Sequence, residues 1–289
     1  MDDFRVLVHL HLYHFDMWEE ISSYLSLLEN YNYDLYVTIP QDSELICSSI
    51  KKFKNNSVIE VVKNKGFDVG PFIFVLSKVN LSNYDFVIKL HTKRTLVNKF
   101  HINYFNMKGN RWKKYLFSFI SSKNRLQKSI EALNTNPSLG MVADRRIIAD
   151  IHDLSCGMES DVANLMKSIG LPSQKNYKFI AGTMFICKAK LLIPLKKLNL
   201  TIDDFKVSNR SEGNSLAHII ERFLGAIVYS QGYEISDPNV SFFQSLNVKP
   251  LRKIFYNLSN FIFQDYVNSK DYRKIKVFLV TIYKKKITQ

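Results

Sequence analysis

The sequence predicts an α/β protein with a mostly parallel central sheet, because strand-like and helix-like segments alternate along most of its length. Short apolar runs rich in β-branched residues are typical of strands, and they are separated by longer segments with helical periodicity. At 289 residues the chain can bury a full core, and its hydrophobic fraction of 46% is ordinary for a globular protein. Helices are therefore expected on both faces of the sheet.

The first half of the chain contains four expected strands with helices between them. Asp16, with Glu19 three residues later, predicts a capping box at the start of the first helix. Pro40 ends the second strand, and a turn from Gly66 to Pro71 leads into the third helix. The strands are expected at residues 4–12, 34–39, 58–62 and 86–90, and the helices from residue 16, at 43–54 and at 72–78.

The second half is less regular and ends in a basic tail. An aromatic helix is expected after residue 112, helices at 125–133, 159–169 and 214–229, strands at 139–143 and 179–187, and a loop at 147–157. The domain boundary is expected near residue 240. It separates a main domain, 1–240, from a basic amphipathic helical segment, 241–289.

The net charge of +14 is unevenly distributed. The last 41 residues carry ten Lys or Arg residues against Asp265 and Asp271, so they contribute +8 of the +14. Apolar and aromatic residues are interleaved with these charges at helical spacing. This mixture suits an anionic membrane surface, where each Lys or Arg contributes roughly 1 kcal/mol. The alternative is a helix pair that packs on the core with a solvated basic face.

The cysteines and the N-terminus favour a cytoplasmic protein. Cys47, Cys156 and Cys187 are widely spaced and match neither a disulfide framework nor a metal site, which fits a reducing compartment. The acidic N-terminus is unlike a signal peptide, and no apolar run approaches the roughly 20 residues of a membrane span. We expect a peripheral protein on the inner face of the plasma membrane.

The most informative stretch is residues 84–94, a buried strand that ends in His91, Thr92, Lys93 and Arg94. In an open α/β sheet, ligands bind just past the carboxyl ends of the strands. Three of these side chains can be cationic, which suits a diphosphate or another anion. An anion-binding site is therefore expected here; the alternative is a solvated basic turn.

The turn at 64–72 is a second candidate. Gly66 and Gly70 permit backbone conformations that other residues resist. Asp68 lies between them and can either accept hydrogen bonds from a ribose or sugar hydroxyl or cap the following helix. The glycine spacing matches neither a phosphate loop nor a dinucleotide fingerprint.

Gly182 and Thr183 lie inside the strand expected at 179–187. Glycine in a strand interior often marks the close approach of a ligand or of another backbone. Thr183 adds a hydroxyl group nearby. The alternative is that Gly182 serves packing alone.

The helix at 214–229 is apolar over most of its circumference, apart from one stripe. His218, Glu221, Arg222 and Gly225 are spaced so that they share a single helix face. Burying such a stripe without partners is costly, so it either faces solvent or lines a site. Glu221 is a candidate general base whose pKa would be set by Arg222 and His218.

Several other mechanisms find no support. The sequence contains no His-Glu-x-x-His, Cys-x-x-Cys or Gly-x-Ser-x-Gly motif. It also has no Asp-x-Asp after a strand, the usual carboxylate pair for a metal-bound nucleotide sugar. Asp203 and Asp204 are a weak substitute in a polar loop.

Taken in order, these segments resemble the rhamnan synthesis protein F family of bacterial glycosyltransferases. The resemblance runs from about residue 5 to 235, and the basic tail lies outside it. The matching stretches are His11-Leu-Tyr13 with Trp18; residues 33–39; Asn64 with Gly66-x-Asp68-x-Gly70-Pro71-Phe72; Lys89-Leu-His-Thr-Lys93; Arg111-Trp112; Ala181-Gly-Thr-Met-Phe185; and Ala217-His218-x-x-Glu221-Arg222-x-x-Gly225.

The resemblance implies a GT-A-like αβα sandwich that transfers a sugar from a nucleotide-activated donor to a lipid-linked cell-surface polysaccharide such as an O-antigen, a capsule or a rhamnan. It suggests dTDP-rhamnose as the donor first, with GDP- or UDP-sugars as alternatives. Asp68 would orient donor hydroxyls, and Glu221, beside His218, would deprotonate the acceptor.

The donor-binding residues would be His91, Thr92, Lys93, Arg94, Gly66, Gly70, Gly182, Thr183 and Arg222. Because cationic side chains stand where a carboxylate pair is usual, we expect Lys93, with His91 or Arg94, to stabilise the diphosphate without a metal cofactor.

Two other classes of protein remain possible from the sequence. A non-catalytic sugar- or nucleotide-binding module of a polysaccharide-assembly complex would keep the fold and the tail but lack turnover. A nucleic-acid-binding protein would fit the charge, but the sequence contains no recognised nucleic-acid motif, so no nucleic-acid partner is expected.

Overall fold

The structure is a computed structural model. It describes residues 4–94, 101–102, 105–154, 156–207, 215–240, 253–254, 257–258, 261–267, 272–278 and 280–286. The chain forms two compact units. The large unit comprises Met1–Arg94 with Lys113–Asn239, and the small unit comprises Thr95–Trp112 with Val240–Gln289.

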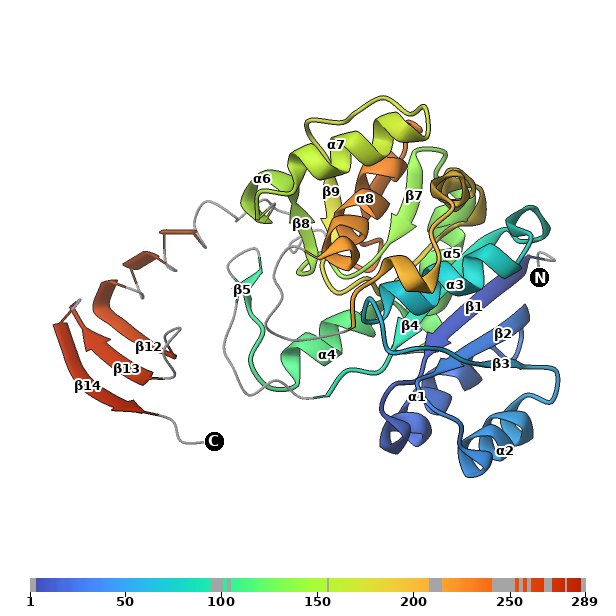
Figure 1. Cartoon of the computed structure of the whole chain (residues 1–289), viewed down its shortest axis with the longest axis horizontal. Helices are drawn as coiled ribbons and strands as arrows, with labels where there is room; N and C mark the ends of the chain where they lie inside the picture. Colours follow the sequence, from blue (N-terminus) through green and yellow to red (C-terminus); the bar gives the residue numbers. More distant parts are fainter. Residues whose placement is uncertain are drawn as a thin grey trace. The chain divides into compact units, whose positions relative to one another are not determined.

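The large unit is built on a seven-stranded sheet with the order β11-β7-β10-β4-β1-β2-β3 (Figure 1). All neighbouring strands are parallel except β10, which runs antiparallel to β4 and β7. The start of β10 therefore lies at the same edge as the carboxyl ends of the other strands. The strands are β1 (Arg5–His11), β2 (Asn32–Ile39), β3 (Val58–Val61), β4 (Phe86–His91), β7 (Leu139–Val142), β10 (Phe185–Lys188) and β11 (Glu234–Ser236).

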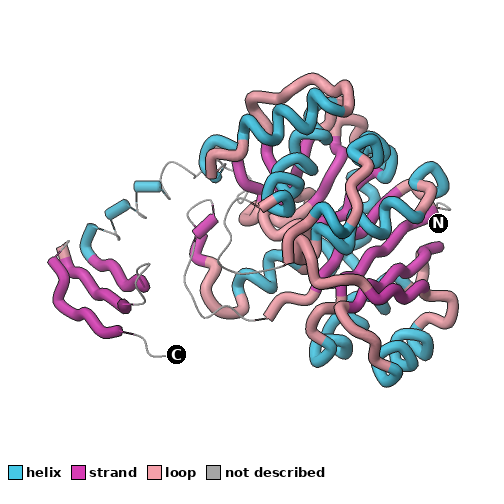
Figure 2. Tube along the Cα trace, viewed as in Figure 1, coloured by secondary structure: helices cyan, strands magenta, loops and turns pink. Residues whose placement is uncertain are grey.

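Helices flank this sheet, and the expected αβα sandwich with a mostly parallel sheet is confirmed (Figures 1 and 2). Helices α3 and α8 contact each other, and α3 packs on β1. Trp18 of α1 packs against Phe53 of α2. The α-helices are α1 (Trp18–Leu25), α2 (Glu44–Phe53), α3 (Val69–Lys78), α4 (Arg111–Leu116), α5 (Lys123–Thr135), α6 (Ile151–Leu154), α7 (Glu159–Ser168) and α8 (Leu216–Ser230).

The central strands form where the sequence is mostly apolar. In β1 every residue after Arg5 is buried, and all of β4 is buried. Strands covered on both faces show such runs, whereas half-exposed strands alternate. Ser43 starts α2 by accepting a hydrogen bond from the Ile46 N–H at 3.4 Å.

Three predictions about local structure in the large unit are wrong. No side-chain cap from Asp16 occurs at the start of the first helix; Asp16 pairs with Arg94 instead. The expected loop at 147–157 contains β8 (Ile148–Asp150) and α6. The expected strand at 179–187 is two strands, because a turn at 181–184 separates β9 (Lys178–Ile180), which pairs with β8, from β10.

The helical prediction for the tail is also wrong over most of the residues described there. The small unit contains an antiparallel sheet of β12 (Phe263–Val267), β13 (Tyr272–Val277) and β14 (Val280–Lys286), and a pair of two-residue strands, β5 (His101–Ile102) and β6 (Phe105–Asn106). In β13, Ile275 and Val277 alternate with Lys274 and Lys276. This period of two favours a strand over a helix. Helical residues are described only at 253–254, 257–258 and 261–262.

Among the described residues, no helix is long and apolar enough to cross a bilayer.

Candidate active site

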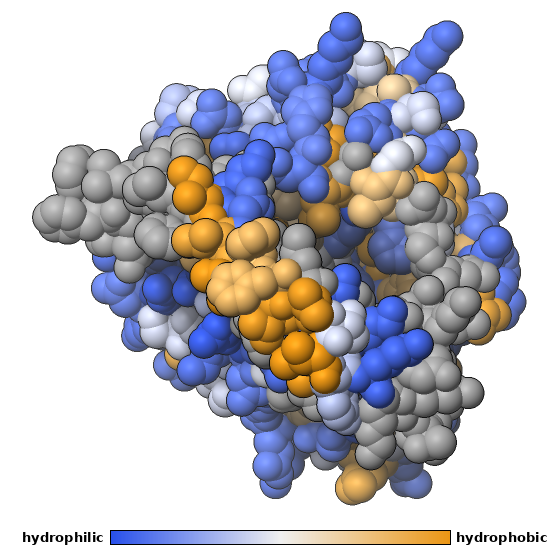
Figure 3. Space-filling view, turned by 90° about the vertical axis from the view of Figure 1, so that its left-hand side faces the viewer, coloured by the Kyte–Doolittle hydropathy of each residue, from blue (hydrophilic) through white to orange (hydrophobic). Residues whose placement is uncertain are grey.

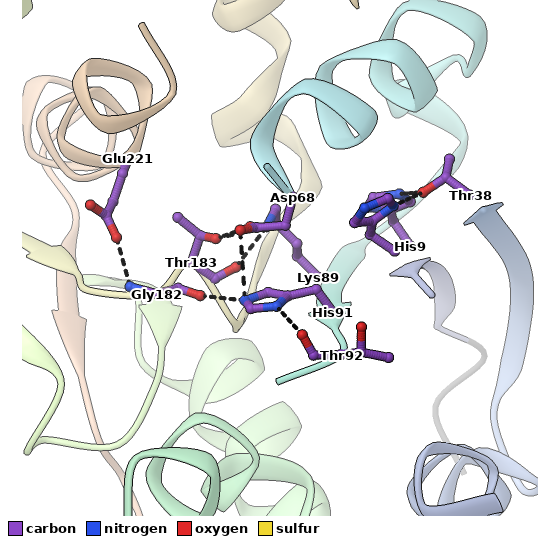
Figure 4. Close-up of polar contacts among 10 residues, drawn as sticks. His9, Thr38, Asp68, Lys89, His91, Thr92, Gly182, Thr183 and Glu221 are labelled. Carbon is purple, nitrogen blue, oxygen red and sulfur yellow. Dashed lines mark hydrogen bonds and ion pairs between the residues drawn. The ribbon is translucent and has the colours of Figure 1, made fainter. Parts of the chain in front are cut away.

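A fully buried lysine lies at the centre of the site. Lys89 is in the middle of β4, and its side chain is 0% exposed. Its ammonium group donates to the Asp68 carboxylate, to the Thr183 carbonyl at 3.1 Å and to the Thr183 hydroxyl at 2.8 Å (Figure 4). An ammonium group has three N–H donors, so the described partners satisfy all of them. Burial lowers the pKa of Lys89, and the Asp68 charge opposes that shift.

Asp68 lies at the start of α3 but does not cap it. Its backbone occupies the N-cap position, yet its side chain makes no capping hydrogen bond, so the capping alternative is wrong. One carboxylate oxygen, Oδ2, binds both Lys89 and the Thr183 hydroxyl, and the other, Oδ1, lies 3.8 Å from His91 Nε2. Burial opposes ionisation, but His91, Lys89 and Thr183 outweigh it and hold the pKa of Asp68 well below its usual range.

The Gly182–Thr183 turn contacts three other elements, which are β4, α8 and the start of α3. Gly182 has φ of 81° and Thr183 has φ of 50°, a left-handed conformation that is rare for a β-branched residue. The Gly182 N–H donates to Glu221 Oε1 at 2.6 Å, and its carbonyl lies 2.9 Å from His91 Nε2. These contacts stabilise a strained backbone, and such backbone is often found at functional sites.

Glu221 reaches the turn from α8. Its second oxygen, Oε2, pairs with Arg222 at 2.9 Å, and its side chain is 16% exposed. Burial raises the pKa of Glu221, while Arg222 and the Gly182 N–H oppose that shift. A carboxyl group with a raised pKa is a better general base near neutral pH.

Arg222, a predicted donor-binding residue, connects α8 to its neighbours. It donates to the carbonyl groups of His218 at 2.9 Å and Leu154 at 3.0 Å, and it lies over the Phe179 ring. His218 is half-buried, and its Nδ1 is 2.8 Å from the Ser215 hydroxyl. The polar stripe predicted on this helix therefore does not face solvent, and its residues have different contacts.

Two predicted donor-binding glycines have a packing reason of their own. A Cβ atom on Gly70 would lie 2.2 Å from the Lys65 carbonyl, and one on Gly66 would lie 2.5 Å from the Phe205 ring. Gly225 on α8 is similar, because its Cβ would lie 2.3 Å from the Lys178 carbonyl. A ligand contact at Gly66 or Gly70 stays a prediction.

The four residues at the end of β4 divide into two groups. His91 and Thr92 are buried: Thr92 accepts from the His14 N–H at 3.1 Å, and burial lowers the pKa of His91. Lys93 is half-buried, and Arg94 forms an exposed ion pair with Asp16 at 2.8 Å. The structure thus brings His91 to the centre of the site and places Arg94 in a separate surface pair.

The sequence-based site list missed Lys89. A charged residue at the middle of an apolar strand was the available signal, because such a residue needs a buried partner. On the neighbouring strands, His9 and His11 both contact the Thr38 hydroxyl at 3.0 Å, and this polar row was missed as well. Phe72 of α3 covers it by stacking on His9.

The described residues do not offer a ready set of metal ligands. In the parts of the chain that are described, no group of three or more His, Cys, Asp or Glu side chains could hold a metal ion. Asp203 binds Lys63 at 2.9 Å and Lys65 at 2.8 Å, and Asp204 forms a capping box with Thr201.

Two solved structures are similar to the chain at low level, both of glucosyl-3-phosphoglycerate synthase from Mycobacterium tuberculosis. The structure with Mn²⁺, UDP and glucosyl-3-phosphoglycerate is 10% identical with a TM-score of 0.34, and that with phosphoglyceric acid is 11% identical with a TM-score of 0.33; each covers 99% of this chain and 90% of the enzyme. Both contain Mn²⁺ with UDP, which contradicts the expectation of a metal-independent reaction, and that expectation is withdrawn. Likeness at this level identifies no metal ligand in this chain.

Two curated relatives and a family model cover most of the large unit. The relatives, both called uncharacterized protein WxcX, come from two strains of Xanthomonas campestris pv. campestris and are 24% identical over 233 residues. The match covers 79% of this chain and 32% of each relative, so the chain spans about a third of their length. The model of rhamnan synthesis protein F matches residues 1–233, and the chain therefore belongs to the rhamnan synthesis protein F family.

Proposed function

We propose that the chain is a glycosyltransferase that uses a nucleotide-sugar donor. The observation that carries the proposal is the ionised Asp68 carboxylate, held by buried Lys89 at the carboxyl edge of the sheet, where open α/β sheets bind ligands. Glu221, a carboxyl with a raised pKa, is connected to the same turn through Gly182. Family membership supports a role in making cell-surface polysaccharide.

Each group has a role in this proposal. Asp68 accepts a hydrogen bond from a hydroxyl group of the nucleotide-sugar donor. Glu221 removes the proton of the acceptor hydroxyl while the oxygen of that hydroxyl attacks the sugar. His91 and Lys93 lie at and just beyond the end of β4, and the positive charge of Lys93 stabilises the negative charge that develops on the leaving diphosphate. The donor proposed first is dTDP-rhamnose, with GDP- or UDP-sugars next, and the acceptor is a lipid-linked glycan.

We further propose that the small unit attaches the protein to the inner face of the plasma membrane. Around the β13–β14 turn, Phe261, Phe278 and Val280 are 51%, 60% and 65% exposed. Apolar side chains gather there in a strip bordered by hydrophilic ones (Figure 3). An apolar strip in a segment of charge +8 suits an anionic bilayer surface.

A non-catalytic binding module is the second candidate. It is favoured by one observation, which is that both Glu221 oxygens already have partners. Turnover separates the two functions, because a binding module would bind the donor without consuming it.

The test is a panel of dTDP-rhamnose, UDP-glucose and GDP-mannose, with and without EDTA and Mn²⁺. Thermal shift reports binding, and release of the nucleoside diphosphate reports turnover. We expect one nucleotide class to bind and turn over, and Glu221→Gln to reduce turnover at least about a hundredfold while binding persists. Glu29→Gln, on an exposed surface, is the matched control. Binding without any turnover would favour the module, and no binding would overturn both.

A further inference from the structure

We propose that Lys89 is a positioning residue: it holds Asp68 so that Oδ1 binds a hydroxyl group of the nucleotide sugar. This inference rests on the proposed function, and it adds a residue and an atom to it. The hydroxyl belongs either to the transferred sugar or to the pentose of the nucleotide, which is ribose in UDP and deoxyribose in dTDP; the two sources have the same chemistry.

The two oxygens of Asp68 have different surroundings. Oδ2 is occupied by the Lys89 ammonium and the Thr183 hydroxyl. Oδ1 lies 3.8 Å from His91 Nε2, a nitrogen that is itself 2.9 Å from the Gly182 carbonyl. The Asp68 side chain is 18% exposed, so a ligand can reach it. Oδ1 is therefore the oxygen with capacity for a new hydrogen bond.

The charges around Asp68 favour a hydroxyl over a cation. The Lys89 ammonium is in direct contact, and Lys93 follows on the same strand end. These groups repel a second cation but leave the carboxylate a strong acceptor for an O–H donor. Carboxylate hydrogen bonds of this kind are roughly twice as strong as those between neutral groups.

Lys89 also determines where Asp68 lies relative to the rest of the site. It binds the Thr183 carbonyl and hydroxyl on one side and Asp68 on the other, so it connects the start of α3 to the turn before β10. Phe67, next to Asp68, has φ of 54° and Thr183 has φ of 50°. The ammonium group contacts Thr183 directly and binds the carboxylate of the residue that follows Phe67.

The same turn carries the candidate base. The Gly182 N–H binds Glu221 and the Thr183 hydroxyl binds Asp68, so both carboxyl groups are attached to the same two-residue turn. Lys89 thus connects the group proposed to bind the donor with the group proposed to act on the acceptor (Figure 4).

The experiment compares Lys89→Met, Asp68→Asn and the double variant with the wild-type chain. Each single change leaves one charge buried without its partner, so each should lower the Tm, and the double variant should recover most of that loss. Its affinity for the nucleotide sugar should stay at least about tenfold below wild type, because the carboxylate is gone. If the double variant regains stability and affinity together, the pair is structural only and the proposal is overturned.

The pH dependence of donor binding provides a second measurement, which a purely structural role of Lys89 would leave unchanged. Without Lys89, the Asp68 carboxyl loses a cationic neighbour, and its pKa rises, so the acid limb of donor binding by Lys89→Met should move to higher pH. If Lys89→Met does not fold, Thr183→Val supplies the test, because it removes one hydroxyl partner and keeps the charges paired. An unchanged acid limb in the variant that folds would overturn the proposal.

A set of nucleotide probes distinguishes the two sources of the hydroxyl, and it also distinguishes failure of the proposed function from failure of the role of Lys89. UDP and UDP-glucose are compared, along with dTDP and dTDP-rhamnose. Asp68→Asn should weaken only the sugar-linked compound if Oδ1 binds the sugar, and both compounds if it binds the pentose. If the wild-type chain binds none of these compounds, the proposed function fails. If it binds them but the Tm losses of Lys89→Met and Asp68→Asn simply add in the double variant, only the role of Lys89 fails.

Discussion

The two units of the chain depart from the ordinary globular pattern in opposite ways. The large unit buries charge: Lys89 and Arg222 are 0% and 4% exposed. The small unit exposes apolar surface, including Phe278 and Ile282. A buried polar group or an exposed apolar patch is more informative than the usual arrangement, because each is unfavourable unless something compensates it.

The structure shows what compensates the buried charges of the large unit, whereas the partner of the exposed apolar surface of the small unit is a proposal. In the large unit, partners from the start of α3, the turn before β10 and α8 satisfy the buried charges. In the small unit, compensation would come from outside, and we propose that a membrane supplies it. Polar residues in the large unit should therefore control stability and chemistry, whereas apolar residues in the small unit should control attachment.

The largest expected effect is at Arg222. Arg222→Met removes the partner of Glu221 and the donor to the His218 and Leu154 carbonyls, so we expect a loss of about 3–5 kcal/mol in unfolding free energy. Arg94→Met is the matched control: its pair with Asp16 is 61% and 62% exposed, so the loss should be below about 1 kcal/mol. Urea unfolding measures both. Equal losses would mean that burial does not distinguish the two pairs.

The second prediction concerns packing under the same helix. Gly225→Ala places a Cβ atom 2.3 Å from the Lys178 carbonyl and 2.7 Å from the Phe179 side chain, so α8 must move away from β9. We expect about 1–3 kcal/mol of destabilisation and lower turnover, because Glu221 is on α8. Gly170→Ala, which meets no atom within 4 Å, should cost only about 1 kcal/mol for its positive φ and leave turnover unchanged. Unchanged turnover in Gly225→Ala would mean that the position of α8, and with it Glu221, does not affect the reaction.

The third prediction uses pH. Burial lowers the pKa of His11 to about 3, below its unfolded value of 6.5, so the unfolded chain binds protons first. Stability should therefore fall as pH drops below about 6.5 and level off near 3, by at most about 1.4 kcal/mol per pH unit for this group. His11→Gln should flatten that slope in urea unfolding at pH 7, 6 and 5, whereas exposed His152→Gln should not.

The same pH range should affect the large unit and the basic tail differently. Residues 240–289 contain no histidine, so vesicle binding through this segment should stay constant from pH 5 to 7 while the large unit loses stability. Parallel losses of both would argue that attachment depends on the large unit.

The sequence predicts the central strands well for a physical reason. Residues 4–12 and 86–90 are mostly apolar, and this local composition already indicates strands that are buried on both faces. The break at 181–184 has no such signal, since residues 179–187 are mostly apolar and the turn is held by Asp68 and Lys89, about a hundred residues away. Long-range partners of this kind are invisible to local patterns.

The candidate site shows the same division. Asp68, Gly182 and Glu221 were identified from spacing, and the structure brings them to one turn. Arg94 was grouped with His91 by adjacency, but successive residues past a strand need not share an environment. Lys89 is conspicuous within an apolar strand, but the local pattern does not identify Asp68 and Thr183 as its partners.

The smallest expected effect on stability, and the most direct test of the small unit, is Phe278→Ser. Phe278 is 60% exposed, so unfolding free energy should change by no more than about 0.5 kcal/mol. If Phe278 enters a bilayer interface, its loss removes roughly 1.5–3 kcal/mol of apolar transfer, which is about tenfold or more in affinity for vesicles containing phosphatidylglycerol.

Leu45→Ser is the matched control for this change, because Leu45 is 79% exposed but belongs to the large unit. It should alter neither stability nor co-sedimentation with vesicles. Added salt should weaken wild-type binding, since the basic residues of the tail contribute through screened attraction to anionic lipid. Equal vesicle binding by Phe278→Ser and wild type would mean that charge alone attaches the tail, and that the exposed apolar strip has another partner.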